Sequence, residues 1–196
     1  MSFKINIVAV IILISVLQCF AQEKTNLQVF ELLVDSSVIT LTSSIPYTVR
    51  PLNIEMNTGT SYEIFNSEII SDLNQKGYKL IPDEQAFRIQ YFIKSASVSY
   101  GNMFRHGILG DYFVPRSVQL SGNFNITLGS TITNNFNYSF KDTVNVDDVK
   151  NLENPAYPFT QGKLPTEPFF SGILEPVVAV GTVALAVILF FTVRSK

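Results

Sequence analysis

The stretch FRIQYFIKSASVSY at residues 87–100 decides the fold, because it is long enough to form one long strand of a sheet. Hydrophobic residues occupy every second position as far as Ile93, which is the pattern of a β-strand with one buried face. Beyond Lys94 the apolar residues lie at the opposite parity: Ala96, Val98 and Tyr100. Because successive side chains of a strand point to opposite faces, this change predicts a β-bulge or a strong twist near Ser95.

Two further long strands follow this stretch. Hydrophobic residues alternate along residues 118–128, and aromatic residues lie on one face of residues 133–142. Gly129 and Ser130 lie between the two segments and provide a hairpin-type connection. The second half of the domain is therefore predicted to be a meander of long antiparallel strands.

The first half of the domain contains two predicted helices. Residues 27–44 follow helical spacing, although the β-branched run at residues 38–42 leaves a strand open for the second half. Residues 49–56 then indicate a short strand, which Pro51 weakens.

Residues 60–76 form the clearest helix of the sequence. Thr60 and Glu63 have the spacing of a capping box, in which each side chain satisfies an unpaired amide at the helix start. Gly77 is placed to close the helix in the left-handed conformation, and residues 78–81 follow as a short strand.

The N-terminal residues have the composition of a secretory signal peptide. One positive charge precedes an almost entirely apolar run from residue 5 to residue 17. Cleavage after Ala21 fits this pattern, so residues 1–21 are the predicted signal peptide. An uncleaved N-terminal anchor is the alternative. Lipidation of Cys19 is disfavoured, because the large side chain of Gln18 precedes it.

The C-terminal residues form a second apolar segment. Residues 176–193 carry no charge, and a run of about 18 or more apolar residues can cross a bilayer as a helix. We therefore expect a transmembrane helix over residues 172–193 in contact with the lipid bilayer. Cytoplasmic flanks carry an excess of Lys and Arg, so residues 194–196 are the predicted cytoplasmic tail. These features predict a single-pass protein of the inner (plasma) membrane with its domain outside the cytoplasm.

The predicted fold is α+β: two helices pack on a mostly antiparallel sheet of long strands, and one C-terminal helix crosses the membrane. The domain is predicted to cover residues 22–145, and residues 146–171 to be an extended spacer, because prolines interrupt them. The formal net charge of −2 does not indicate nucleic acid as a partner. Cys19 is the only cysteine, so the mature domain would have no disulfide.

Few residues are arranged for catalysis. His106 is the only histidine, and a lone histidine in a loop is more often a polar surface residue than a general base. The sequence has no pair of histidines or cysteines for the common zinc sites. We expect no catalytic residues, no cofactor and no metal. A hydrolase that uses His106 stays open, because the members of a catalytic triad need not be close in sequence.

The loop at residues 101–116 is the predicted interaction element. It combines aromatic and aliphatic residues with arginines, and protein interfaces favour aromatic residues and arginine at their centres. The alternative is that the apolar residues fold back onto the sheet as a lid over the core. The residues of the predicted interaction loop are Met103, Phe104, Arg105, His106, Leu109, Tyr112 and Phe113.

The order of elements over residues 27–128 resembles a bacterial envelope domain. The helix at residues 60–76 ends in SDLNQKGY, and a short strand follows directly. This motif is similar to the α/β domain of the curli-secretion (CsgG-like) and TolB amino-terminal type. The resemblance implies a role in envelope assembly or transport without an enzymatic site. The residues before and within the last apolar run also look like the tails of uncharacterised membrane-anchored proteins of Bacteroidetes-type bacteria.

The expected function is therefore that of a non-enzymatic, membrane-anchored protein, an interaction or assembly component of the bacterial cell envelope with an envelope protein as its partner. The alternative is a periplasmic module that binds a lipid or a glycan. It predicts an enclosed apolar pocket between the helix at residues 60–76 and the sheet.

Overall fold

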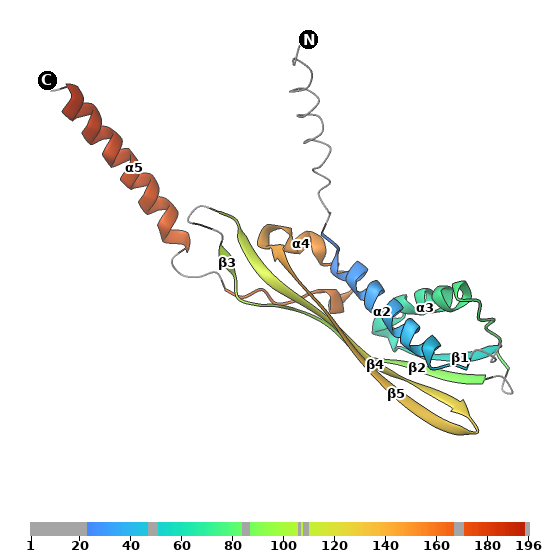
Figure 1. Ribbon diagram of the computed structural model, residues 1–196. Coiled ribbons are helices and arrows are strands. Elements are labelled where there is room, and N and C mark those ends of the chain that lie inside the picture. The colour runs from blue at the N-terminus through green and yellow to red at the C-terminus, as the bar shows by residue number, and fades with distance from the viewer. Residues whose placement is uncertain are drawn as a thin grey trace, which may run out of the picture.

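The computed structural model describes residues 23–46, 51–83, 87–105, 107, 110–166 and 171–194, with the side chains of α5 described over residues 177–192. The predicted signal peptide, with Cys19, lies outside these residues. A twisted five-stranded sheet carries two helices on one face, α2 (Asn26–Ser43) and α3 (Ile64–Gln75) (Figure 1).

The sheet is mixed, with one parallel pair and otherwise antiparallel pairs. Its strands are β1 (Leu52–Asn57), β2 (Phe87–Tyr100), β3 (Phe104–Arg105), β4 (Tyr112–Leu128) and β5 (Ser130–Asn145). The order is β1-β2-β4-β3, and β5 pairs with β4. β1 runs parallel to β2, whereas β2, β3 and β5 are all antiparallel to β4. The long antiparallel strands and the hairpin at Gly129 are present as predicted, but both strands are longer: β4 begins at Tyr112 instead of residue 118, and β5 extends beyond the predicted residues 133–142 at both ends.

The predicted irregularity in β2 is a register shift in its pairing with β4. Ile93 pairs with Gly122 and Ser95 pairs with Ser121, so Lys94 is the extra residue of a bulge. The prediction from the change of hydrophobic parity is confirmed. A Cβ atom on Gly122 would lie 2.1 Å from the backbone oxygen of Phe92, so the strands can approach here only because residue 122 is glycine.

Helix α2 is continuous, so the strand left open for its second half does not form. Thr25 caps it: the hydroxyl of Thr25 accepts a hydrogen bond from the amide of Gln28, and the amide of Thr25 donates to the Gln28 side chain. This is a capping box, in which two unpaired amides are satisfied reciprocally. One stripe of α2 is buried against the sheet: Val29, Phe30, Leu33, Val34, Ser37, Val38 and Leu41.

Helix α3 begins later than predicted, and its start has no capping box. Residues Thr60–Tyr62 form a 3₁₀-helix, and Glu63 precedes α3 without a side-chain capping bond. Its end is as predicted, because Gly77 has φ +81°. The amides of Gly77 and Tyr78 donate to the carbonyls of Asn74 and Leu73 in a Schellman motif. The predicted strand at residues 78–81 is reduced to one bridge, Leu52 to Leu80.

The core lies between the helices and the sheet and extends past residue 145. Phe159, from a 3₁₀-helix (Pro158–Thr160), packs into it with ring centroids 5.2 Å from Phe30 and 5.4 Å from Phe65. Thr160 is fully buried. Residues after β5 are therefore packed on the domain, within the segment for which the sequence predicts a spacer.

A second, smaller core cluster lies at the far end of β4 and β5. It contains Val114 and Val144 of the sheet with Val149 and Leu152 of α4 (Val149–Leu152). Met103 is partly buried and packs against this cluster. The sheet therefore has hydrophobic support at both ends.

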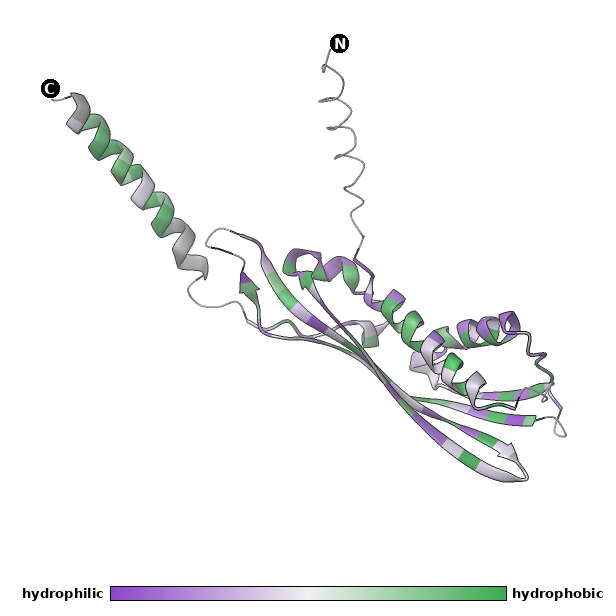
Figure 2. Ribbon diagram, viewed as in Figure 1, coloured by the Kyte–Doolittle hydropathy of each residue, from purple (hydrophilic) through white to green (hydrophobic). Residues whose placement is uncertain are grey.

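The last helix, α5 (Ser171–Arg194), is exposed along its described side chains, which are mostly hydrophobic (Figure 2). Within the described residues, no helix has both the length and the hydropathy for a membrane crossing. The predicted transmembrane helix over residues 172–193 is therefore wrong, and the predicted single-pass topology in the inner membrane is unsupported.

Candidate functional site

The predicted interaction loop is a β-hairpin that extends the sheet beyond the end of β2. Phe104 of β3 pairs with Phe113 of β4, and Arg105 pairs with Tyr112. The ring centroids of Phe104 and Phe113 lie 6.2 Å apart. The guanidinium carbon of Arg105 lies 4.1 Å from the centroid of the Tyr112 ring, in the geometry of a cation–π contact. We call these four residues the hairpin cluster.

The hairpin cluster is partly open to solvent. Phe104 is 38% exposed, whereas Arg105, Tyr112 and Phe113 are half-buried. Met103, also predicted to belong to this surface, packs against the second core cluster. His106 and Leu109 lie outside the described residues. Cross-strand pairing thus holds aromatic rings and one guanidinium group in a fixed arrangement at one end of the sheet.

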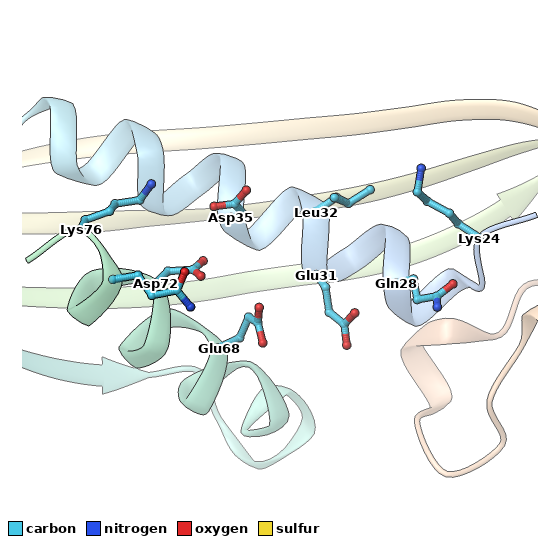
Figure 3. A pocket seen from close by; sticks show the side chains of 9 residues that line it. Lys24, Gln28, Glu31, Leu32, Asp35, Glu68, Asp72 and Lys76 are labelled. Carbon is cyan, nitrogen blue, oxygen red and sulfur yellow. The ribbon is translucent and has the colours of Figure 1, made fainter.

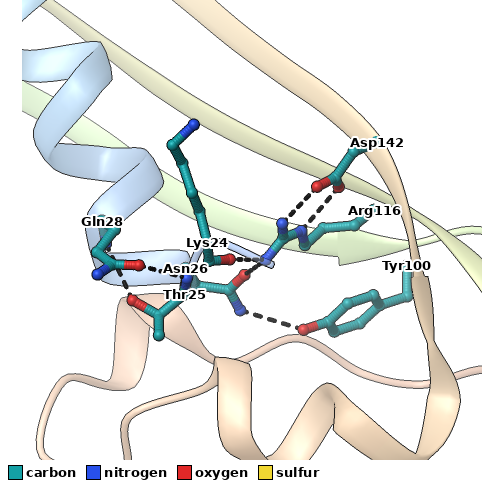
Figure 4. Close-up of polar contacts among 7 residues, drawn as sticks. All are labelled: Lys24, Thr25, Asn26, Gln28, Tyr100, Arg116 and Asp142. Atoms are coloured by element: carbon teal, nitrogen blue, oxygen red, sulfur yellow. Dashed lines mark hydrogen bonds and ion pairs between the residues drawn. The ribbon is translucent and has the colours of Figure 1, made fainter. Parts of the chain in front are cut away.

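Next to this hairpin, a buried guanidinium group ties the start of α2 to the sheet (Figure 4). The Arg116 side chain is fully buried and donates two hydrogen bonds to the carboxylate of Asp142, at 2.8 and 2.5 Å. It also donates to the backbone oxygen of Lys24 and to Oδ1 of Asn26, at 2.9 and 2.8 Å. Because an unpaired buried charge is costly, this set of partners fixes where the chain enters α2.

Asn26 and Tyr100 extend this network. Nδ2 of the buried Asn26 donates to the hydroxyl of Tyr100 at 3.1 Å and to the backbone oxygen of Thr160 at 2.7 Å. Burial raises the pKa of Tyr100 to about 12, so its hydroxyl stays protonated at neutral pH. The network joins the beginning of α2, the centre of the sheet and the segment after α4. Sequence analysis missed it, and its only signal was an arginine at an inward-facing position of a strand.

A polar groove of about 840 Å³ lies between α2 and α3 (Figure 3). Four carboxylates line it, with Lys24 and Lys76 also among its lining residues: Glu31, Asp35, Glu68 and Asp72. Burial, followed by the neighbouring charge of Glu68, raises the pKa of Glu31. Burial and then the charges of Asp35 and Glu68 raise the pKa of Asp72. The groove is thus a place where like charges repel.

Substituting Asp72 with asparagine is expected to stabilise the domain at neutral pH. A carboxyl group whose pKa is raised by folding binds protons more tightly in the folded chain, so stability falls as the pH rises through the raised pKa. The variant should melt at a slightly higher temperature than the wild type at about pH 7. The difference should vanish below about pH 3, where Asp72 is protonated in both states. Thermal unfolding followed by circular dichroism at both pH values tests this, and a lower midpoint at neutral pH would contradict it.

A second groove, of about 900 Å³, lies beside the bulged part of β2. Its aromatic lining comes from Tyr62, Tyr157 and Phe159. The hydroxyl of Tyr62 accepts a hydrogen bond from the amide of Ala96 at 3.3 Å. The pairing of β1 with β2 ends at Phe92, so Tyr62 provides a partner for a backbone amide that β1 does not reach. The space between α3 and the sheet is different: Phe65, Ile69 and Leu73 fill it.

Among the residues that the structure describes, no group of three or more His, Cys, Asp or Glu side chains could hold a metal ion. The hairpin cluster offers aromatic faces and a guanidinium group, which suit contact with a protein surface.

The comparisons with known proteins give no family for this chain. No protein-family model matches the sequence, and no curated protein matches it. The structure is similar to a minor lipoprotein from Acinetobacter baumannii (TM-score 0.35, 16% identity, covering 52% of this chain and 70% of that chain). It is also similar to the rare lipoprotein B from Shewanella oneidensis (TM-score 0.33, 13% identity, covering 74% of this chain and 95% of that chain).

Both of these structures are bacterial lipoproteins by name, and neither links the chain to the CsgG-like or TolB families. The predicted resemblance to those two families gains no support from them. At these TM-scores the likeness carries no argument about function.

Proposed function

We propose that this chain is a non-enzymatic protein of the bacterial cell envelope that acts by binding another envelope protein through the hairpin cluster. The observation that carries the proposal is the fixed, partly open arrangement of Phe104, Arg105, Tyr112 and Phe113. Aromatic residues and arginine supply most of the energy of protein interfaces, and a rigid arrangement lowers the entropic cost of binding.

The position of the hairpin cluster favours the same proposal. β3 and β4 present it at one end of the sheet, and Met103, the residue before Phe104, packs against the second core cluster. The Arg116 network lies a few residues further along β4 and holds that strand to the start of α2. A binding surface built on paired strands is held more firmly than one on a flexible loop.

Association with the envelope is supported by the two ends of the chain. The N-terminal sequence has the features of an export signal. Large hydrophobic side chains of α5 are exposed, and an apolar surface of this extent is a contact site for a membrane or a protein. The proposal requires that the protein is associated with the envelope, and it does not depend on whether α5 contacts a membrane or a protein.

The two alternative functions have less support. A ligand-binding module predicts an apolar pocket between α3 and the sheet, where the structure places the core residues Phe65, Ile69 and Leu73. A hydrolase would depend on His106, which lies outside the described residues.

The test of the proposal is the loss of a partner when the hairpin cluster is truncated. The full chain is purified from envelope fractions in a mild detergent, and the co-purifying protein is measured. Phe104→Ala and Tyr112→Ala should each weaken the interaction by about 2 kcal/mol, roughly 30-fold, because the ring that packs in the interface is lost. Ile70→Ala on α3 is the matched control, since Ile70 is 39% exposed and far in sequence from the hairpin.

Thermal unfolding separates binding from stability in this test. Both hairpin variants should melt close to the wild type, because Phe104 and Tyr112 lie outside the buried core. Equal recovery of the partner with all three variants would refute the proposed surface.

A further inference from the structure

β5 is an edge strand of the described sheet. β5 runs from Ser130 to Asn145, and among the residues that the structure describes its only strand partner is β4. The pairing with β4 is regular from Leu128 opposite Ser130 to Phe113 opposite Asn145, with no bulge. Every second residue of β5 therefore directs its amide and carbonyl groups toward the open edge.

Residues 130–140 of this edge lack the prolines, bulges and charges that usually prevent pairing with another chain. Proteins protect edge strands with prolines, bulges, charges or a covering segment. Residues 130–140 of β5 contain no proline and no charged side chain. Of the two charged residues that follow, Asp142 is neutralised by Arg116. An unprotected edge of this length is suited to accept a further strand.

The flank of α2 nearest the edge strand carries no charged side chain. The hydroxyl groups of Thr40 on α2 and Tyr138 on β5 lie 2.5 Å apart, so this flank of α2 lies over β5. Ser36 and Ser43 are four residues before and three residues after Thr40 and share its flank. No charge on this flank would repel an approaching chain.

We propose that the open edge of β5 pairs antiparallel with β5 of a second copy of this chain, centred on Phe136. In this register Ile132 lies opposite Phe140 of the second copy, on the face that carries α2. On the other face Asn135 lies opposite Asn137 of the second copy, and Thr133 opposite Ser139 of the second copy. The two sheets become one continuous sheet through a two-fold axis.

The side chains of β5 favour a second copy as the occupant. Ile132 is 58% exposed, and Phe140 is partly buried, so the pairing covers an apolar side chain that is otherwise in water. Lys141 lies opposite Thr131 of the second copy, so no like charges are directly opposed. The opposed polar positions carry small amide and hydroxyl groups, which suit each other across a two-fold axis.

Charge variants at the opposed asparagines test the pairing. Asn135 and Asn137 are exposed, so charges there are tolerated in the isolated chain. Asn135→Glu with Asn137→Glu places like charges opposite each other twice in the dimer. Asn135→Glu with Asn137→Lys is the matched control, because it places opposite charges at the same positions. The association of the full chain is measured by analytical ultracentrifugation in a mild detergent at low salt.

The expected result is a wild-type dimer that the control variant keeps. The dissociation constant of the dimer should be about tenfold higher for the variant with two glutamates than for the control, because like charges directly opposed across strands destabilise the pairing. A monomeric wild type, or equal association of the two variants, would overturn the proposal. These substitutions leave the hairpin cluster intact, so this outcome is independent of the test of the proposed function.

Discussion

Replacing Gly122 with alanine is expected to destabilise the domain by about 3 kcal/mol. The added Cβ atom would lie 2.1 Å from the backbone oxygen of Phe92 and 2.4 Å from the ring of Phe136. The backbone oxygen belongs to the neighbouring strand at the bulge, so relief requires β2 and β4 to separate. Urea unfolding of the full chain in a nonionic detergent, followed by circular dichroism, gives the change in free energy.

Gly101→Ala is the control for this prediction. Its added Cβ atom would lie 3.4 Å from the nearest atom, on the side chain of Pro115, so the strand need not move. We expect a change within about 0.5 kcal/mol for this variant. If Gly122→Ala is as stable as Gly101→Ala, the close approach of β2 and β4 at the bulge is refuted.

Replacing Arg116 with methionine is expected to destabilise the domain by about 3 kcal/mol. Methionine keeps much of the volume but removes every donor. The carboxylate of Asp142, the side-chain oxygen of Asn26 and the backbone oxygen of Lys24 then lose a charged partner. Buried acceptors without donors carry the full cost of desolvation. The same urea unfolding measures the loss.

An exposed ion pair provides the comparison for Arg116. Arg88 lies 2.9 Å from Glu55 on the surface, and both side chains are largely solvated. Arg88→Met should leave the stability unchanged within error, because exposed ion pairs contribute little. Adding Asp142→Asn to Arg116→Met should cost less than the two single changes summed, because the second change removes the unpaired charge. Strict additivity would show that Arg116 and Asp142 act independently.

Hydrophobic periodicity predicted those elements whose buried residues recur at regular positions in the sequence. β2 was predicted from its first to its last residue, and its change of parity located the bulge beside Lys94. The closing glycine of α3 was predicted because a left-handed residue after a helix favours glycine. These features depend on residues close together in sequence.

Helix starts were less well predicted, because several residues match the same local pattern. Thr60 and Glu63 have the spacing of a capping box, yet a 3₁₀-helix occupies that position. The real capping box is at Thr25 and Gln28. The difference arises from tertiary packing, which local spacing does not contain: Tyr62 turns toward β2 to meet the amide of Ala96.

The sequence predicted which residues make up the candidate site but not how they are arranged in space. The sequence showed that Phe104, Arg105, Tyr112 and Phe113 are close along the chain, but not that they pair across two strands. The longest link of the Arg116 network joins Asn26 to Thr160, 134 positions away in the sequence, and no local pattern predicts such a contact. The segment around Phe159 was assigned to a spacer because its prolines obscure the periodicity that buried residues usually show.

Site-specific photo-crosslinking in intact cells tests the central claim most directly. A photoreactive phenylalanine analogue is introduced at position 104 in the full chain, and at position 70 in a control. We predict one crosslinked envelope protein from position 104, a much weaker product from position 70, and loss of the first product when Tyr112→Ala is added. Equal products from both positions, or a product at position 104 that Tyr112→Ala leaves unchanged, would contradict the account.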